Sequence, residues 1–527
     1  MMKFIFPLIL FLFVIEVSAQ LQPESFNLPK DKNYLSKTTS SNPISNSILD
    51  IVTLGDTVWL GTSRGVSVSY DRGENWTNFY GTSPFGNDNV SALAYNKYDG
   101  SIWAAIATSV PAPGGGTVPK GTGLRYTTDS GFTWNAVPQP VDHPDSNTVR
   151  YGINILNALP VTVAEQNITY DISFTPGTVW ITSFAGGTRR SSDMGQTWQR
   201  VVIPPDNLNS IKPEDSLDFC LSPIGGAFCS EGNLNHRAFA VIAIDDSTIL
   251  VGTANGINKT TNANDLYPSW IKYNHQNQNE PISGNFITAL GYNSTNPPTI
   301  WASTWKAEMP EEFYGVSAST NSGETWQTFL DDERAHNFGF KGNNLIVATD
   351  NGAFRTSNQG STWILPTAII DTISDPTSKI YLRTNIYYSA AFQDNDIWLG
   401  SGDGLVNLEE TSFWTGRWKI YFAADELKSK SETYCYPNPF SPRQEELKII
   451  YSTDNKPASV TIRIFDFGMN YIRTVIQNVT RQRGSEGPPD FWDGKDDNGN
   501  YLPNGVYFYR VDVDDEEPLF GKIIYLQ

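Results

Sequence analysis

Short runs of apolar residues recur along most of the chain, and each run predicts a β-strand. The clearest run is Val58-Trp59-Leu60-Gly61-Thr62, and similar runs begin at Ile102, Val179, Ile249, Ile300, Leu345 and Ile397. A further short apolar segment precedes these runs, for example Val90 to Ala94. β-branched and aromatic residues favour strands, and no long segment has the 3.6-residue period of a helix. The pattern therefore predicts an all-β protein.

A second pattern, Ser/Thr-x-Asp/Asn-x-Gly-x-x-Trp, follows most of these runs. Its defining residues are Asp71, Gly73 and Trp76; Asp129, Gly131 and Trp134; Asp193, Gly195 and Trp198; Asn321, Gly323 and Trp326; and Asn358, Gly360 and Trp363. In a turn, Asp or Asn accepts backbone N–H bonds, Gly adopts a positive φ, and Trp fills the layer beneath. Because the acidic residue recurs and is replaced by Asn in two copies, we expect it to be structural rather than catalytic.

Together the two patterns predict units of four strands, with the Asp/Asn turn between the third and the fourth. The predicted units span 48–80, 89–137, 167–203, 237–274, 284–330, 335–366 and 387–421. Four-stranded units in such a series are typical of a β-propeller. We therefore expect a seven-bladed β-propeller over residues 48–423.

The repeated turn resembles that of the Asp-box (BNR) family, which includes sialidases, sortilin-type receptors, xyloglucanases and photosystem assembly factors. The stretch Ile397 to Gly404 is also similar to the propeller repeats of two-component sensor ectodomains. These resemblances imply the fold and say little about activity, because one fold carries many functions.

Short polar turns lie on one side of the expected ring and long insertions on the other. The insertions are 108–122, 138–166, 204–236, 305–315 and 367–386. Loops on a rigid scaffold commonly carry recognition, so the side with the insertions is the expected binding face; alternatively, the insertions only cover the mouth of the ring. The candidate contact residues on this face are Tyr151, Phe184, Arg189, Trp305, Tyr314 and Tyr387.

Signatures of catalysis are missing from the sequence. No Arg-Ile-Pro tripeptide of the sialidase kind occurs, and Asp350 in Ala348-Thr-Asp-Asn-Gly352 fits the generic turn chemistry of the repeat. We find no catalytic triad signature and no nucleotide-binding glycine loop. The sequence favours a non-enzymatic protein, with an extracellular glycoside hydrolase as the alternative.

The end of the chain predicts a second domain. Residues 424–433 are charged and small and form an expected linker, and Tyr436-Pro-Asn-Pro439 opens an extended segment. Alternating strands then predict a small Ig-like β-sandwich over 434–527. This segment resembles the Ig-like domain of the flagellar hook-capping protein and type IX secretion sorting domains. The resemblance implies a role in export or attachment through the outer-membrane export machinery.

Four polar residues near this end, Asp493, Asp496, Asp497 and Asn498, could suggest a calcium loop. Their spacing lacks the full ligand series of an EF-hand, so we expect a hairpin turn rich in Asp, Asn and Gly.

The start of the chain has the features of a secretory signal. Lys3 precedes an apolar run from Phe4 to Ile15, and Val17-Ser18-Ala19 suits cleavage. We therefore expect a signal peptide over 1–19 and a lead-in over 20–47, with no transmembrane segment in the mature chain. The predicted location is extracellular or on the cell surface.

The net charge, the cysteines and the histidines indicate which binding partners, disulfides and metal sites to expect. The chain carries 37 Lys and Arg against 56 Asp and Glu, a net charge of −19, which argues against nucleic acid. In an oxidising compartment, Cys220 and Cys229 could close a disulfide, which leaves Cys435 as an expected small buried residue. The four histidines show no paired spacing, so we expect no metal site and no cofactor.

The most economical interpretation is an exported propeller that binds an extracellular glycan or protein ligand. The two alternatives are a glycan-active hydrolase and a purely structural surface component.

Overall fold

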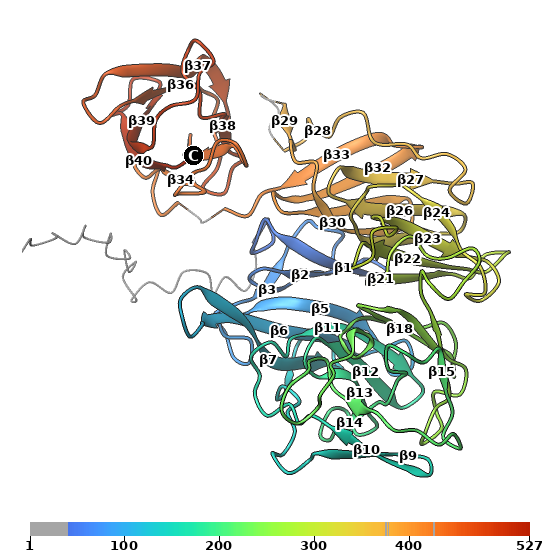
Figure 1. Cartoon of the computed structure of the whole chain (residues 1–527). Coiled ribbons are helices and arrows are strands. Elements are labelled where there is room, and N and C mark those ends of the chain that lie inside the picture. The colour runs from blue at the N-terminus through green and yellow to red at the C-terminus, as the bar shows by residue number, and fades with distance from the viewer. Residues whose placement is uncertain (1–39, 375–376, 378, 425–426) are drawn as a thin grey trace, which may run out of the picture. The chain divides into compact units, whose positions relative to one another are not determined.

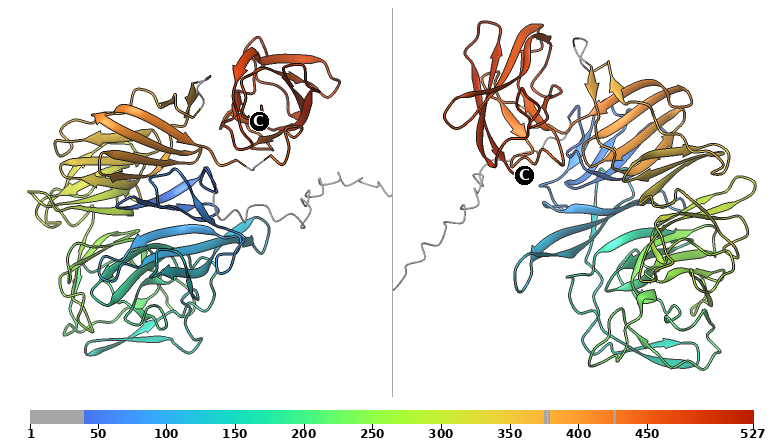
Figure 2. Two further views of the ribbon diagram at one scale, coloured as in Figure 1. Left: turned by 180° about the vertical axis from the view of Figure 1, so that it is seen from behind. Right: turned by 45° about the horizontal axis from the view of Figure 1, so that its top comes forward.

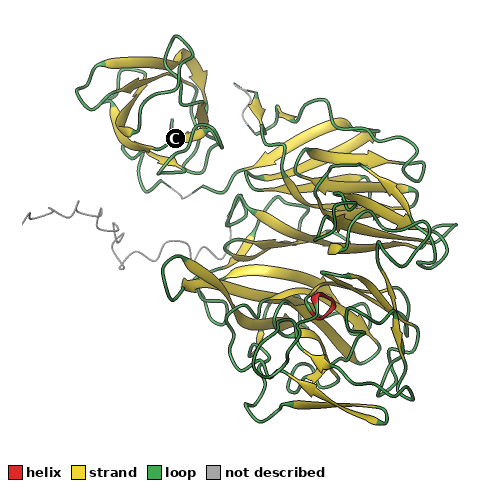
Figure 3. Cartoon of the chain, in the orientation of Figure 1, coloured by secondary structure: helices red, strands yellow, loops and turns green. Residues whose placement is uncertain are grey.

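The computed structural model describes residues 40–374, 377, 379–424 and 427–527. This part consists of β-strands, and its one helical element is a three-residue 3₁₀ helix, η1 (Leu234–His236) (Figure 3). No helix within these ranges is long and apolar enough to span a membrane. The predicted signal peptide and residues 20–39 of the predicted lead-in lie outside the described residues. The prediction of an all-β protein is confirmed.

Residues 48–421 form a series of antiparallel meanders, in which each strand pairs with the next along the chain (Figure 1). The first three consist of β1 (Ile48–Leu54), β2 (Thr57–Thr62), β3 (Gly65–Ser69) and β4 (Thr77–Phe79); β5 (Asn89–Tyr95), β6 (Ile102–Pro111), β7 (Thr117–Thr127) and β8 (Asn135–Val137); and β11 (Thr169–Thr175), β12 (Thr178–Ser183), β13 (Gly187–Ser191) and β14 (Gln199–Arg200).

The meanders that follow are built in the same way, with small additions. They consist of β17 (Ala238–Ala243), β18 (Ile249–Thr253), β19 (Gly256–Thr260) and β20 (Trp270–Tyr273), extended by β15 (Ser210–Ile211); β21 (Phe286–Asn293), β22 (Thr299–Trp305), β23 (Gly315–Ser319) and β24 (Gln327–Phe329); β25 (Ala335–Lys341), β26 (Asn344–Thr349) and β27 (Gly352–Thr356); and β30 (Tyr387–Gln393), β31 (Asp396–Ser401), β32 (Leu405–Ser412) and β33 (Thr415–Tyr421), extended by β28 (Ile370–Asp371) and β29 (Ile380–Tyr381).

The first strand of each meander contacts the first strand of the next, and this series of contacts closes on itself. Its order is β1, β5, β11, β17, β21, β25, β30 and again β1. A closed ring of meanders with their first strands innermost is a β-propeller. Figure 2 shows the same sheets from two further directions.

Buried aromatic rings hold neighbouring meanders together, and the clearest case lies where the ring closes. Trp76, after β3, lies 6.1 Å from Trp398 of β31 and 5.9 Å from Tyr421 of β33 between ring centroids. All three side chains are buried. Burial of one large apolar side chain stabilises a fold by roughly 1.5–3 kcal/mol, so this cluster fastens the last meander to the first.

The repeated Asp/Asn turn has one hydrogen-bond pattern wherever it occurs in full. Ser69 Oγ donates to Asp71 Oδ1 at 2.8 Å, Gly73 N–H donates to Ser69 Oγ at 2.7 Å, and Asn75 N–H donates to Asp71 Oδ1 at 2.8 Å. The same three bonds recur around Asp129, Asp193, Asn321 and Asn358. The carboxylate and amide oxygens of these residues are therefore engaged within their own turns.

One expected loop insertion proves to be a strand extension. Residues 108–122 continue the hairpin of β6 and β7 as far as Pro111 and from Thr117 onward. Three consecutive glycines, Gly114 to Gly116, all have positive φ and turn the chain between the two strands. The Pro and Gly content that suggested a loop belongs to this turn and its flanks.

The other insertions contain short strands of their own. Residues 138–166 include the hairpin of β9 (Thr148–Tyr151) and β10 (Asn154–Ala158), and β10 pairs in parallel with β16 (Cys220–Leu221). Cys220 of β16 forms a disulfide with Cys229.

Residues 434–527 form two further sheets around a core of their own. One sheet contains β34 (Tyr434–Tyr436), β35 (Leu447–Ile450) and β38 (Asp490–Trp492), and the other contains β37 (Tyr471–Arg481), β36 (Ala458–Phe465), β39 (Gly505–Val513) and β40 (Leu519–Tyr525). Phe440, Trp492 and Tyr509 are buried in one cluster with side chains of both sheets. Cys435 is a partly buried free thiol whose pKa burial raises to about 12.

Candidate binding site

The first strand of every meander carries a β-bulge close to its start. In β1, β5, β11, β17, β21, β25 and β30, the register against the following strand shifts by one residue. The residues skipped by these shifts are Leu49, Ser91, Tyr170, Phe239, Thr288, His336 and Tyr388. A bulge changes the direction of a side chain and is common beside functional sites.

The aromatic residues at these bulges belong to one continuous line of ring contacts. Phe239 lies 5.2 Å from Tyr170 and 4.6 Å from Phe286 between ring centroids. Trp305 lies 6.0 Å from Phe286 and 5.7 Å from His336, and His336 lies 5.4 Å from Tyr388.

Two more rings join this line at its sides. Phe184 lies 6.4 Å from Phe239, and Tyr314 lies 6.0 Å from Trp305. We call the complete set the aromatic arc; it consists of Tyr170, Phe184, Phe239, Phe286, Trp305, Tyr314, His336 and Tyr388.

All residues of the aromatic arc are partly exposed to solvent. They come from the starts of first strands, from the end of the second strand β22, from the residue directly after the second strand β12, and from the residue before β23. In an antiparallel meander these ends lie on the same side, so the arc lies on the side of the ring that carries the insertions. Edge-to-face ring pairs contribute about 0.5–1.5 kcal/mol each and fix the rings in place.

Charged groups surround the arc. Arg237 lies 5.3 Å above the ring of Phe184, and Arg334 lies 4.6 Å above that of Tyr314. His336 Nε2 lies 2.7 Å from Asp350 Oδ1, which fixes the imidazole within the line of rings. The site therefore combines apolar ring surface with fixed cations, a combination suited to binding an amphipathic ligand.

Two carboxylates of the inner strands hold neighbouring meanders together. Asp50 of β1 accepts the N–H of Leu93 in β5 at 3.2 Å, and Asp171 of β11 accepts the N–H of Val241 in β17 at 2.8 Å. Burial raises the pKa of each carboxyl group to about 7. Because backbone donors occupy both groups, their position indicates a structural role.

Three of the six predicted contact residues, Phe184, Trp305 and Tyr314, lie together in the aromatic arc. The other three do not reach it. Tyr151 is only 1% exposed and its hydroxyl donates to Pro268 O at 2.8 Å, and Tyr387 is 4% exposed. Arg189 is buried and forms a two-pronged pair with Asp142, at 2.8 and 3.0 Å. The prediction of an exposed contact role is therefore corrected for Tyr151, Arg189 and Tyr387.

The sequence interpretation missed five members of the arc, namely Tyr170, Phe239, Phe286, His336 and Tyr388. Four of them are the bulged residues of inner strands. The signal that could have found Tyr170, His336 and Tyr388 is a polar aromatic residue near the start of an innermost strand, where a regular strand facing the core would be uniformly apolar. Phe239 and Phe286 carry no such signal.

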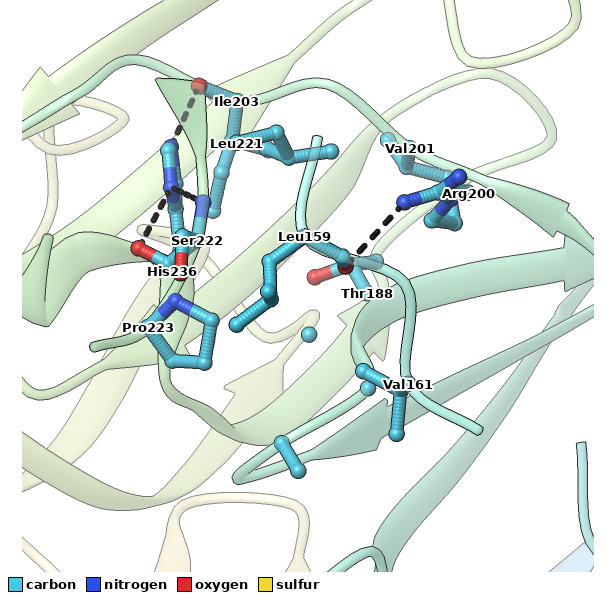
Figure 4. Close-up of a pocket in the computed structure, with 13 residues that line it drawn as sticks. Leu159, Val161, Thr188, Arg200, Val201, Ile203, Leu221, Ser222, Pro223 and His236 are labelled. Atoms are coloured by element: carbon cyan, nitrogen blue, oxygen red, sulfur yellow. Dashed lines mark hydrogen bonds between the residues drawn. The ribbon is translucent and has the colours of Figure 1, made fainter. Parts of the chain in front are cut away.

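Figure 4 shows a pocket elsewhere in the propeller, lined by Leu159, Val161, Thr188, Pro223 and His236 among others. Its volume is about 20 Å³, which holds little more than one water molecule. His236 is buried here, and burial lowers its pKa to about 4, so it is neutral at neutral pH. This pocket is too small to be the ligand site.

Within the described residues, no group of three or more His, Cys, Asp or Glu side chains is arranged to hold a metal ion. The acidic residues near 493–498 serve a turn instead: Asp496 Oδ1 accepts the N–H groups of Asn498 at 2.9 Å and Asn500 at 2.8 Å. Asp493 Oδ1 accepts a hydrogen bond from Arg473 Nη1 at 3.0 Å.

No protein-family model and no curated protein matches the chain. Among solved structures, the chain is similar to PorZ, an essential bacterial surface component of the type-IX secretion system of Porphyromonas gingivalis, with 12% identity and a TM-score of 0.38. That match covers 91% of this chain and 66% of PorZ, so the chain spans a little under two thirds of that protein.

Two further solved structures match the chain with similar TM-scores. YCF48 from Cyanidioschyzon merolae is 13% identical, with a TM-score of 0.37 over 69% of this chain and 92% of YCF48. The extracellular domain of a putative one-component system from B. thetaiotaomicron is 12% identical, with a TM-score of 0.32 over 91% of this chain and 86% of that domain. With TM-scores between 0.32 and 0.38, these similarities assign no function to the chain.

Proposed function

We propose that the chain is an exported bacterial surface or secreted protein that binds an extracellular glycan or protein ligand at the aromatic arc. In this proposal residues 48–423 are a seven-bladed Asp-box propeller. The observation that carries the proposal is the arc itself, a continuous line of partly exposed rings on the side of the ring with the insertions.

The physical argument for binding rests on rigidity and exposure. Rings that are held edge to face lose little conformational entropy when a ligand covers them, so their contact area is available for affinity. Trp305 is fixed further, because its Nε1–H donates to Ala335 O at 3.0 Å. A purely structural cluster would bury these rings, whereas all of them retain exposed surface.

Export is supported by the signal-like start of the sequence and by the disulfide between Cys220 and Cys229, since disulfides persist in oxidising compartments. We propose that residues 434–527 are an Ig-like domain that serves export or surface attachment through the outer-membrane export machinery. Their two sheets around a shared core support the sandwich part of this proposal.

The test is a glycan-array screen with the purified chain, run beside a panel of fluorogenic glycosidase substrates. We expect binding without turnover, lost in Trp305→Ala and retained in Phe132→Ala. Phe132 is 84% exposed and lies in a repeated turn away from the arc, so it is the matched control. Binding that survives Trp305→Ala would contradict the placement of the site, and turnover would favour the hydrolase alternative.

A further inference from the structure

Two arginines occupy equivalent places on the aromatic arc. Arg237 directly precedes β17 and Arg334 directly precedes β25, and each is followed by an alanine and then by a bulged ring, Phe239 or His336. Their backbones are also bonded alike. The carbonyl of Arg237 accepts the N–H of Ala254, and that of Arg334 accepts the N–H of Asp350, both at 3.1 Å. The arc thus repeats one arginine position in two of its meanders.

Each of these guanidinium groups lies over a ring from the preceding meander. Arg237 lies 5.3 Å from the ring centre of Phe184, just after β12. Arg334 lies 5.7 Å from that of Trp305, at the end of β22. A cation above a ring face is attracted by the ring quadrupole, so both groups are held at the arc instead of moving freely in solvent.

Neither arginine forms an ion pair with an acidic side chain in the part of the chain that the structure describes. Arg237 Nε donates to Pro223 O at 2.9 Å, and Arg334 Nη2 donates to the hydroxyl of Tyr314 at 3.2 Å. The nearby carboxylate of Asp350 is engaged by His336. In a chain with 56 acidic and 37 basic side chains, two fixed arginines without acidic partners leave charge for a ligand to neutralise.

The rings between and beside the arginines offer apolar faces with polar edges. The hydroxyl groups of Tyr170 and Tyr388 lie at the two ends of the line and form no hydrogen bond with any described residue. A sugar ring has the matching character, since its C–H face packs on an aromatic face and its hydroxyls bond to polar edges. A guanidinium suits a carboxylate because it can form two parallel hydrogen bonds with it.

An acidic peptide is the competing ligand. One common mode of peptide binding adds an extended peptide to a regular strand edge through main-chain bonds, and another reads acidic side chains with clustered arginines. The arc lies where bulges interrupt the strand pairing, and it offers side chains instead. A glycan therefore fits the arc better than a peptide does.

We infer that the aromatic arc binds an acidic glycan chain, with sugar carboxylates at Arg237 and Arg334 and sugar rings stacked on the arc between them. This inference rests on the proposed function, because it names the ligand class of the same site.

The test is a titration of the purified full chain with oligomers of galacturonate, mannuronate and hyaluronate, with a methyl-esterified galacturonate oligomer and a neutral glucan, and with polyglutamate. We expect at least one acidic oligosaccharide to bind. Its neutral counterpart should bind with an affinity lower by about tenfold or more, because the charge-assisted hydrogen bonds to the arginines are lost. Its affinity should fall as salt is raised.

The variants distinguish a specific role of the two arginines from a general effect of positive charge on binding. Arg334→Gln and Arg237→Gln should each weaken acidic binding about tenfold. Arg443→Gln is the matched control and should change nothing. It removes the same charge from an exposed arginine within residues 434–527, whose guanidinium also lies over a ring, that of Tyr501, at 5.0 Å. Melting curves establish that every variant is folded, and Arg334, which is exposed, is the safer of the two substitutions.

The outcomes distinguish this inference from the proposed function. Neutral glycan binding that is lost in Trp305→Ala but unchanged in both arginine variants would overturn the inference and leave the binding function standing. Polyglutamate binding with the same arginine dependence would overturn the glycan assignment alone. No binding of any glycan or of polyglutamate would overturn the inference and the glycan arm of the proposed function, leaving a protein ligand as the occupant of the arc.

Discussion

Trp305 and His336 lie on neighbouring meanders with their ring centroids 5.7 Å apart and their planes at 73°. The indole of Trp305 also donates from Nε1 to the carbonyl of Ala335, the residue directly before His336, at 3.0 Å. The end of β22 is thus joined to the start of β25 by a ring contact and a hydrogen bond together. Trp305 therefore belongs to the exposed surface of the aromatic arc and also stabilises the contact between two meanders.

The two roles of Trp305 can be separated by substitution. Trp305→Phe retains a ring but loses the Nε1–H bond, and we expect it to lower the free energy of unfolding by about 0.5–1.5 kcal/mol. Trp305→Ala also loses the ring contacts, and because the side chain is partly exposed we expect a further loss of about 1–2 kcal/mol. Urea unfolding of both variants measures the two steps.

Phe132→Ala supplies the control for these measurements. Its side chain is 84% exposed, so we expect a change within about 0.5 kcal/mol. If Trp305→Phe unfolds at the same urea concentration as the unchanged protein, the hydrogen bond to Ala335 contributes nothing to stability. The two meanders are then joined by the ring contact alone.

The strands of the propeller were largely predictable because their apolar runs repeat. The run Val58 to Thr62 lies within β2, and the run from Ile397 to Ser401 lies within β31. The aromatic arc was predictable only in part. Tyr387 and Tyr388 are adjacent, yet the first is buried and the second belongs to the arc, because the bulge in β30 sets which of them turns outward.

A bulge is a property of hydrogen bonding between two strands, and a single strand's sequence does not reveal it. The same holds for Arg189, whose partner Asp142 lies far away in the sequence and is brought to it by the path of an insertion. Tyr151 was misplaced for a related reason. The loop that contains it folds into the hairpin of β9 and β10, and this hairpin directs the ring toward Pro268.

Asp171 should make the propeller less stable as the pH rises through neutrality. Its pKa is raised by burial from 3.8 to about 7 in the folded chain, so between these values the folded state retains a proton that the unfolded state has lost. The stabilisation is complete below pH 3.8 and is lost as the pH rises through about 7. Because the residue is only partly buried, solvent screens part of the charge, and we expect an effect on the order of 1–2 kcal/mol.

Asp171→Asn tests this sign directly. The amide oxygen can still accept the N–H of Val241, while the charge of the carboxylate is removed. We expect the variant to melt at a higher temperature than the unchanged protein at about pH 8, with the difference shrinking toward about pH 5. A variant that is less stable at every pH would show that the charged carboxylate, and not only its oxygen, holds β11 to β17.

Gly73 should tolerate no side chain. Its φ is +89°, and a Cβ would lie 2.5 Å from the Tyr421 hydroxyl and 2.6 Å from the Trp398 ring. Gly73→Ala therefore adds backbone strain and a clash at the point where the ring closes, and we expect a loss of about 2–4 kcal/mol. Gly55→Ala is the control, because its φ is +58° and nothing lies within 4 Å of the added carbon. Thermal melts of the pair should differ by the clash alone, and equal losses would show that strain accounts for the whole effect.

Asp490 should be the most sensitive carboxylate of residues 434–527. Burial alone would raise its pKa, but Arg483 and Arg481 hold it below 3.8, and the hydroxyl of Tyr451 donates to it at 2.5 Å. Arg481 Nη2 and Arg483 Nη1 both lie 3.0 Å from its oxygens. Asp490→Asn would leave two arginines beside one neutral group in a buried setting, and we expect a loss of about 3–5 kcal/mol.

The pH dependence of this group has the opposite sign to that of Asp171. Since the folded pKa lies below the unfolded 3.8, the stabilisation is present above that pH and is lost as the pH falls through the folded value. Unfolding of residues 434–527 can be followed by hydrogen exchange of β36 and β39, which isolates them from the propeller. Asp515→Asn, an exposed change in the same segment, should leave exchange unaltered. Equal exchange in both variants would mean that the arginines are neutralised by other groups and that Asp490 is dispensable to the core.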